Sequence, residues 1–186
     1  MALRNSYEAY GTLARLFHWL TVIFVIAAWA IGMFRGELPQ GAARATAMLV
    51  HINLGLAVLG LLVARILWRL ADPAPPPPKT PLGRPGEIAA AAAHGVSYLL
   101  LLAVPLIGIA MVFARGRPLS VLGLYEIASP WVADRAFGDM LKPYHALMGH
   151  ALIAIAGLHA VAALVHHFVF RDATLRRMIG PAPERA

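Results

Sequence analysis

The sequence contains no cysteine among its 186 residues. This absence excludes disulfides, thiolate metal sites, iron–sulfur clusters and the covalent attachment of c-type haem, all of which need cysteine side chains. Charged residues are also scarce, at 13% of the chain, while 60% of the residues are hydrophobic. Because a soluble domain carries about twice that charged fraction, the composition disfavours a water-soluble enzyme and indicates a lipid bilayer as the solvent.

Four segments each hold a stretch without Asp, Glu, Lys or Arg that is long enough to cross a hydrocarbon core of about 30 Å as a helix. Backbone groups in lipid must find hydrogen-bond partners within their own segment, so we predict α-helices there. The predicted helices cover residues of about 12–34, 45–70, 88–114 and 143–170. The expected fold is an all-α membrane protein, a four-transmembrane-helix bundle that forms one domain over residues 1–186.

Basic residues predict the orientation of this bundle. The proline-rich link 72–85 joins the second and third helices. The longer link 115–142, which is long enough to hold a short interfacial helix, joins the third and fourth. The side with both termini and the proline-rich link receives ten basic residues: Arg4, Arg15, Arg65, Arg69, Lys79, Arg84, Arg171, Arg176, Arg177 and Arg185. The other side receives six: Arg35, Arg44, Arg115, Arg117, Arg135 and Lys142. Both termini are therefore predicted to be cytoplasmic, and the net charge of +7 indicates membrane topology rather than nucleic-acid binding.

Eight histidines stand out in a chain that is otherwise poor in polar groups, and all fall in or at the edge of the predicted helices. Titratable groups inside a bilayer are costly and usually functional. In the fourth helix, His145 and His159 are 14 positions apart, which is 40° short of four turns, so both lie on one face. The rise between them is about 21 Å, most of the depth of the bilayer.

The other helices offer a partner for each of these histidines at a matching depth. The pairs are His51 with His145 near the outer side and His18 with His159 toward the cytoplasm. Paired neutral imidazoles are the expected axial ligands of six-coordinate haem iron, so we predict two non-covalent b haems. Zinc would need three or four ligands at one depth, and a proton relay would more often use carboxylates, which these charge-free stretches lack.

The remaining histidines have less specific interpretations. His94, at the cytoplasmic end of the third helix, is either structural or part of a quinone or proton site. His150 points away from the predicted haem face and is interpreted as structural. His166 and His167 lie next to Arg171 and are interpreted as interfacial residues.

The chain also resembles the bacterial cytochrome b561 family over nearly its whole length. The segments that carry the resemblance are H-W-L at 18–20, F-R-G at 34–36, R-I-L-W-R at 65–69, H-G-V-S-Y-L-L at 94–100, R-G-R-P at 115–118, Y-H at 144–145 and G-L-H-A-V-A-A-L-V-H-H at 157–167. The resemblance implies haem-iron ligands on the first, second and fourth helices, with two of them 14 positions apart. These are the four histidines chosen above from their spacing. It also implies a multi-pass protein of the bacterial inner membrane.

For function, the resemblance implies an oxidoreductase that oxidises superoxide to dioxygen at the outer face and passes the electrons to ubiquinone. Related cytochromes serve as membrane anchors that link a dehydrogenase or hydrogenase to the quinone pool, and this alternative stays open. A third possibility is a haem-free structural or transport protein. A diffusible donor such as superoxide would require no obligate protein partner.

Superoxide and quinone, the substrates that the resemblance implies, predict roles for further residues. Superoxide is a small anion, so a positive outer vestibule would raise its encounter rate. We expect Arg35, Arg115 and Arg117 to form this vestibule, with other outer basic residues, Arg135 among them, more peripheral; pairing of these arginines with haem propionates or phospholipid is the alternative. At the inner end, the expected neighbours of propionates or quinone are Arg65, Arg69 and His94.

Overall fold

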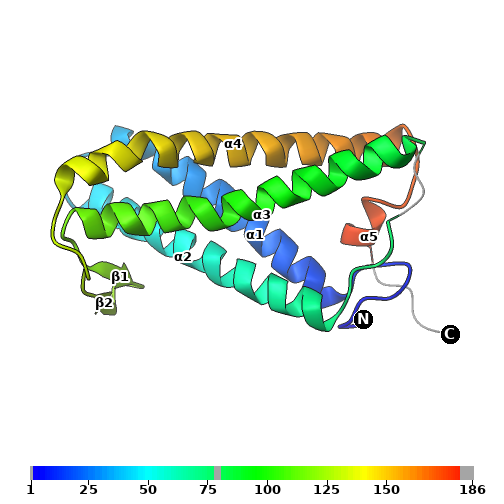
Figure 1. Cartoon of the computed structure of the whole chain (residues 1–186), viewed down its shortest axis with the longest axis horizontal. Coiled ribbons are helices and arrows are strands. Elements are labelled where there is room, and N and C mark those ends of the chain that lie inside the picture. The colour runs from blue at the N-terminus through cyan, green and yellow to red at the C-terminus, as the bar shows by residue number, and fades with distance from the viewer. Residues whose placement is uncertain (1, 78–80, 181–186) are drawn as a thin grey trace. The chain divides into compact units, whose positions relative to one another are not determined.

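The computed structural model describes residues 2–77 and 81–180 of the chain (Figure 1). Lys79 and Arg185, which contribute to the charge count above, lie outside the described residues. The elements are α1 (Thr12–Phe34), the 3-10 helix η1 (Arg35–Glu37), α2 (Ala42–Ala71), α3 (Gly83–Ala114), β1 (Leu119–Val121), β2 (Tyr125–Ile127), α4 (Arg135–Phe168) and α5 (Arg176–Ile179).

Within the described residues, four helices are long and apolar enough to cross a membrane: α1 continued by η1, α2, α3 and α4. The prediction of an all-α membrane protein with four spanning helices is confirmed. Large apolar side chains stand exposed on these helices, with Ile23 57% and Leu158 71% accessible. This exposure is expected because lipid tails solvate such side chains as well as a protein interior does.

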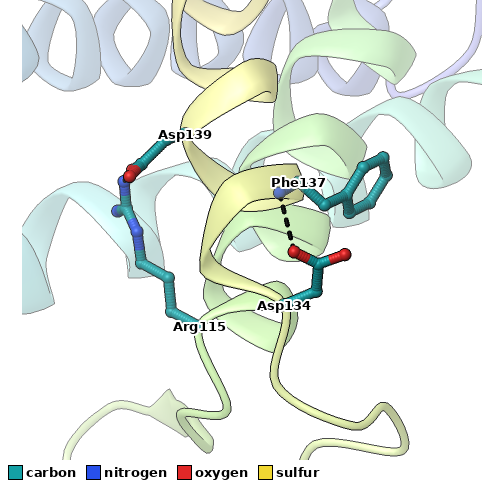
Figure 2. A network of polar contacts seen from close by, with 4 residues as sticks. All are labelled: Arg115, Asp134, Phe137 and Asp139. Atoms are coloured by element: carbon teal, nitrogen blue, oxygen red, sulfur yellow. Dashed lines mark hydrogen bonds and ion pairs between the residues drawn. The ribbon is translucent and has the colours of Figure 1, made fainter.

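All four spanning helices begin before their charge-free stretches, and the difference is largest for α3 and α4. α3 begins at Gly83 rather than near residue 88, and α4 begins at Arg135 rather than near residue 143, so that Pro143 lies inside it. The start of α4 is capped by Asp134, whose Oδ1 accepts a hydrogen bond from the backbone N–H of Phe137 at 3.0 Å (Figure 2). A charge-free stretch marks the part of a helix that suits lipid, whereas the helix itself continues into the polar region.

The link between α3 and α4 contains a small hairpin rather than a short interfacial helix. β1 and β2 are antiparallel, and the turn between them contains Leu122 and Gly123, both with positive φ. Asn53 of α2 anchors this hairpin: its Oδ1 accepts the N–H of Leu122 at 2.7 Å, and its Nδ2 donates to the carbonyl of Ser120 at 3.2 Å. One polar side chain of a spanning helix thus fixes the link between α3 and α4.

The chain divides into two compact units, and every spanning helix contributes a segment to each. Unit 1 comprises Met1–Thr21, Leu61–Tyr98 and Ala154–Ala186, and unit 2 comprises Val22–Gly60 and Leu99–Ile153. In unit 1, the N-terminal segment is tied to the end of α2 because the backbone N–H of Asn5 donates to Oδ2 of Asp72 at 2.8 Å. Arg177 of α5 donates to the carbonyl of Pro76 at 2.6 Å, which ties the C-terminal segment to the proline-rich link.

Candidate functional site

In unit 2, two histidines from different helices face each other. His51 on α2 and His145 on α4 have ring centroids 6.0 Å apart and planes inclined by 72°. Nδ1 of His51 lies 2.8 Å from the carbonyl oxygen of Ala28, and Nδ1 of His145 lies 3.0 Å from that of Val104. A carbonyl oxygen only accepts, so each Nδ1 carries the proton and each Nε2 keeps a free lone pair. Both imidazoles are therefore in the tautomer that can ligate a metal through Nε2.

A glycine makes room for each of these contacts. Gly32 of α1 lies four residues after the carbonyl that His51 contacts, and Gly108 of α3 lies four residues after the carbonyl that His145 contacts. A Cβ atom would lie 3.1 Å from Cε1 of His51 if built on Gly32, and 3.2 Å from Cε1 of His145 if built on Gly108. Both distances are shorter than ordinary carbon contacts of about 3.5–4.0 Å. The same arrangement thus supports both members of the pair.

In unit 1, three histidines from three helices lie together. The ring centroids of His18 on α1 and His159 on α4 are 6.5 Å apart, with planes inclined by 62°. The ring centroid of His94 on α3 lies 5.3 Å from that of His159. The structure thus brings together the two predicted inner ligands, with His94 as a third neighbour.

Two arginines on one face of α2 give this group a positive surrounding. Cζ of Arg65 lies 5.4 Å from the centroid of the Tyr98 ring, in a cation–π contact. The charge of Arg65 acts on both His18 and His94, and that of Arg69, one turn further along α2, acts on His94. An anionic group bound beside these histidines would be stabilised by both guanidinium groups.

Unit 1 also contains buried nitrogen atoms without a partner. Within the described part of the chain, the buried side-chain nitrogen and oxygen atoms that lack a hydrogen bond are Trp68 Nε1, His167 Nδ1 and Arg177 Nε. Such an atom costs about 1–3 kcal/mol when it stays unsatisfied. Oxygen atoms of a bound cofactor, quinone or lipid headgroup would supply the missing acceptors for the N–H groups among them.

The geometry of both histidine pairs fits haem iron. A six-coordinate haem takes one axial imidazole on each face, and with about 2 Å from metal to nitrogen the two ring centroids stand about 6 Å apart. The observed separations are 6.0 Å and 6.5 Å. In residues 2–77 and 81–180, no group of three or more His, Cys, Asp or Glu side chains is placed to hold a metal ion.

A cavity of about 230 Å³ in unit 2 is lined by Arg115, Arg117, Arg135 and Asp139. Nη2 of Arg115 forms an ion pair with Oδ1 of Asp139 at 2.9 Å, across the start of α4 (Figure 2). Three guanidinium groups against one carboxylate leave the cavity positive. Its chemistry is therefore that of an anion-binding site.

The members of this cavity differ in part from the vestibule expected from the sequence. Arg115 and Arg117, two of the three residues predicted for the vestibule, line this cavity. Arg135, which was predicted to be more peripheral, lines it too. Arg35 is not among the lining residues; its charge acts instead on His51. Arg35 thus lies near the histidine pair of the same unit.

Two other histidines have specific partners. His150 accepts a hydrogen bond at Nδ1 from the indole N–H of Trp29 at 3.0 Å, which joins α4 to α1. Nδ1 of His166 contacts the carboxylate of Asp172, a partner that the sequence analysis missed. The charge of Asp172 is visible in the sequence, but its contact depends on how the chain turns after α4.

A bundle of spanning helices with facing imidazole pairs defines the class of b-type membrane cytochromes. The sequence pattern of the prokaryotic cytochrome b561 family matches residues 9–181, and the chain belongs to this family. Membership makes it a membrane protein that binds b-type haem and transfers electrons, as the resemblance implied.

Three curated relatives are similar to this chain, and two of them cover nearly all of it. A probable superoxide oxidase of Yersinia pestis is 37% identical over 174 residues, which are 93% of this chain and 97% of the relative. A cytochrome b561 homolog of Escherichia coli K12 is 32% identical over 181 residues, covering 97% and 96% of the two chains. A cytochrome b562 of Cereibacter sphaeroides is 32% identical over 132 residues, covering 71% of this chain and 67% of the relative.

Proposed function

We propose that this protein is a di-haem b-type cytochrome that oxidises superoxide to dioxygen at the outer face and passes the electrons to ubiquinone. The observation that carries the proposal is the presence, in unit 2, of both a facing imidazole pair and a cavity lined by three arginines. A ligand pair and an anion site in one compact unit suit a small anionic electron donor. The similarity to a probable superoxide oxidase supports the same substrate.

In this proposal His51 and His145 would hold one haem at the outer site, and His18 and His159 would hold the other at the inner site. Bound haem supplies a carrier that takes up and releases one electron at a time. The chain's own task is to hold the imidazoles with Nε2 free, to exclude water and to guide the substrates. At the proposed outer pair, backbone carbonyls keep Nε2 of both imidazoles free, because they accept from Nδ1 and so fix the tautomer of both rings.

Oxidation of superoxide requires no acid or base, because the anion only loses an electron. Two superoxide ions give two dioxygen molecules, and the two electrons with two protons convert one quinone to one quinol. Arg115, Arg117 and Arg135 would attract the anion, since like-signed charges in a cavity focus the field and raise the association rate. Arg65, Arg69 and His94 are the proposed neighbours of propionates or quinone at the inner end.

We further propose a multi-pass protein of the bacterial inner membrane with both termini in the cytoplasm, acting as a single membrane domain. Its partners would be superoxide, ubiquinone and the bilayer, without nucleic acid and without an obligate protein partner. The pairing of the N-terminal segment with Asp72, at the start of the proline-rich link, supports a common side for these segments.

Stopped-flow mixing of the purified holoprotein with superoxide tests this function. We expect rapid haem reduction that slows as salt screens charges over a Debye length of about 10 Å. Arg115→Gln should lower the rate by about two- to tenfold, because it removes one of three attracting charges. The matched control is Arg84→Gln, an exposed arginine at the start of α3 in unit 1, which should leave the rate unchanged.

Slow reduction by superoxide that does not respond to salt would contradict the proposal. If a copurified dehydrogenase or hydrogenase subunit then reduced the haems quickly, the alternative of a membrane anchor would replace it. A purified protein without the visible spectrum of b haem would contradict both.

A further inference from the structure

The chain reverses direction directly after α4 and brings a carboxylate back onto that helix. Arg171 has a positive φ of 54°, a conformation that side chains other than glycine rarely adopt. This turn lets the backbone N–H of Asp172 donate to the carbonyl of His166 at 3.1 Å, while Oδ2 of Asp172 accepts from Nδ1 of His166 at 2.5 Å. The two residues are therefore joined through both backbone and side chain.

The pair is sheltered and fixed. The side chains of His166 and Asp172 are only 17% and 10% exposed. The backbone N–H of Thr174 donates to Oδ1 of Asp172 at 2.8 Å, and the ring of Phe170 packs edge-on against His166 with centroids 5.2 Å apart. Burial by itself raises the pKa of Asp172, but the hydrogen bonds from His166 and Thr174 outweigh it and hold that pKa below its ordinary value. The carboxylate thus stays charged against the imidazole.

The location of the pair relates it to the inner histidines. His166 follows His159 by seven residues on α4, which is two turns, so both occupy nearly the same face about 10 Å apart along the helix. Both belong to unit 1, together with His94. Nδ1 of His166 is engaged by the carboxylate, so its Nε2 is the nitrogen left for other contacts.

Reduction of a quinone consumes two protons as well as two electrons, and the charge-free stretches of the spanning helices offer no carboxylate to supply them. We propose that His166 and Asp172 form the proton-delivery pair for quinone reduction at the inner end, an inference that rests on the proposed function. Nε2–H of the imidazolium donates a proton to a quinone oxygen, Nδ1–H stays bonded to Asp172, and water returns a proton to Nε2. Two such cycles match the two electrons taken from two superoxide ions. His166 transfers the proton, and Asp172 is a positioning residue that orients the imidazole ring through Nδ1.

A purely structural role, in which the pair only ties down the end of α4, predicts different behaviour. His166→Gln distinguishes the structural role from proton delivery. A glutamine amide can still donate a hydrogen bond to Asp172, but it cannot take up and release a proton. Asp172→Asn keeps the size of the side chain and removes its charge.

The experiment uses holoprotein whose haems have been reduced with stoichiometric dithionite, and follows haem reoxidation after mixing. One arm adds a short-chain ubiquinone, which needs protons, and the other adds ferricyanide, which accepts only electrons. We expect His166→Gln to slow reoxidation by ubiquinone about 100-fold and Asp172→Asn about tenfold or more. Both should leave reoxidation by ferricyanide and the haem spectrum unchanged. In both variants, the ratio of the rates of reoxidation by ubiquinone in H2O and in D2O should also be larger than in the unsubstituted protein.

Glu87→Gln, an exposed carboxylate near the start of α3 in the same unit, is the matched control and should change neither arm. Equal rates with ubiquinone in His166→Gln and the unsubstituted protein would overturn the inference while leaving the proposed function intact. Equal slowing in the ubiquinone and ferricyanide arms would overturn it as well, because that result indicates a structural defect. Failure of the unsubstituted protein to be reoxidised by ubiquinone would instead contradict the proposed function itself.

Discussion

Replacing Gly108 with alanine is expected to raise the reduction potential of one haem without displacing it. The new Cβ would lie 3.2 Å from Cε1 of His145, which is closer than an ordinary carbon contact. The imidazole therefore has to move away from α3 by a few tenths of an ångström. This movement lengthens the 3.0 Å contact between Nδ1 and the carbonyl of Val104, and so weakens that hydrogen bond.

The size of the effect follows from the energy of this one hydrogen bond. Donation from Nδ1 to a carbonyl makes the imidazole a more basic ligand, which favours oxidised iron and lowers the potential. A neutral hydrogen bond contributes about 0.5–1.5 kcal/mol net, and a one-electron potential shifts by about 59 mV per tenfold change in equilibrium, or per 1.4 kcal/mol. Complete loss of the bond therefore sets a ceiling of about 60 mV, and partial weakening a rise of about 20–40 mV.

Spectroelectrochemical titration of the purified protein measures this shift, because each haem gives its own midpoint in the b-type bands. Gly32→Ala provides a second perturbation, since its Cβ would lie 3.1 Å from Cε1 of His51, the other member of the same pair. Gly60→Ala on α2 is the matched control, because a Cβ there meets nothing within 4 Å. We expect the same midpoint to rise in both test variants, and neither midpoint to change in the control.

Three results would refute this reasoning. Unchanged midpoints in Gly108→Ala would mean that the glycine does not set the position of the imidazole. Shifts in different midpoints for Gly32→Ala and Gly108→Ala would mean that His51 and His145 do not serve one haem. A fall in potential would contradict the proposed effect of the hydrogen bond on ligand basicity.

Two further predictions concern the ligands and the topology. His145→Ala should remove one of the two haems, seen as half the absorbance of the reduced b bands, whereas His150→Ala should retain both because that imidazole is engaged by an indole; equal haem loss in the two variants would contradict the assignment. In this cysteine-free chain, Leu124→Cys should react with an impermeant maleimide from outside intact spheroplasts, and Pro77→Cys only after lysis, since both positions are exposed and the two links are predicted to lie on opposite sides. The opposite labelling pattern would invert the proposed orientation.

The spanning helices could be predicted because the constraint on them is local. A segment without charge, long enough to cross lipid, has to be helical, and the four helices follow from that rule alone. Their polar ends could not be predicted in the same way. The start of α4 depends on a cap from Asp134, and the hairpin depends on Asn53, which is far from it in sequence. Contacts of this kind depend on tertiary packing, which hydropathy does not encode.

The histidines illustrate the same limit within the site. Helical periodicity and depth lead to the pairs that the structure brings together, because residues on one helix have fixed relative positions. The contact between Gly32 and His51 could not be found in this way, since it depends on the axial register of α1 against α2. Likewise, His166 looks like an interfacial residue until the positive φ of Arg171 returns Asp172 to it.

The two histidine pairs differ in their surroundings, and this difference bears on the direction of electron transfer. Backbone carbonyls accept from the rings of both His51 and His145, which would favour the oxidised iron of a haem held by this pair. Within the described residues, neither His18 nor His159 has a hydrogen-bond partner, and the charges of Arg65 and Arg69 act on the inner histidine group. Positive charge in a medium of low dielectric constant disfavours the extra positive charge of oxidised iron. Arg35 has the same influence near the outer pair, but it is a single charge opposed by two carbonyl contacts. We infer that a haem held by His51 and His145 would have a lower potential than one held by His18 and His159, which is the order that the proposed reaction requires.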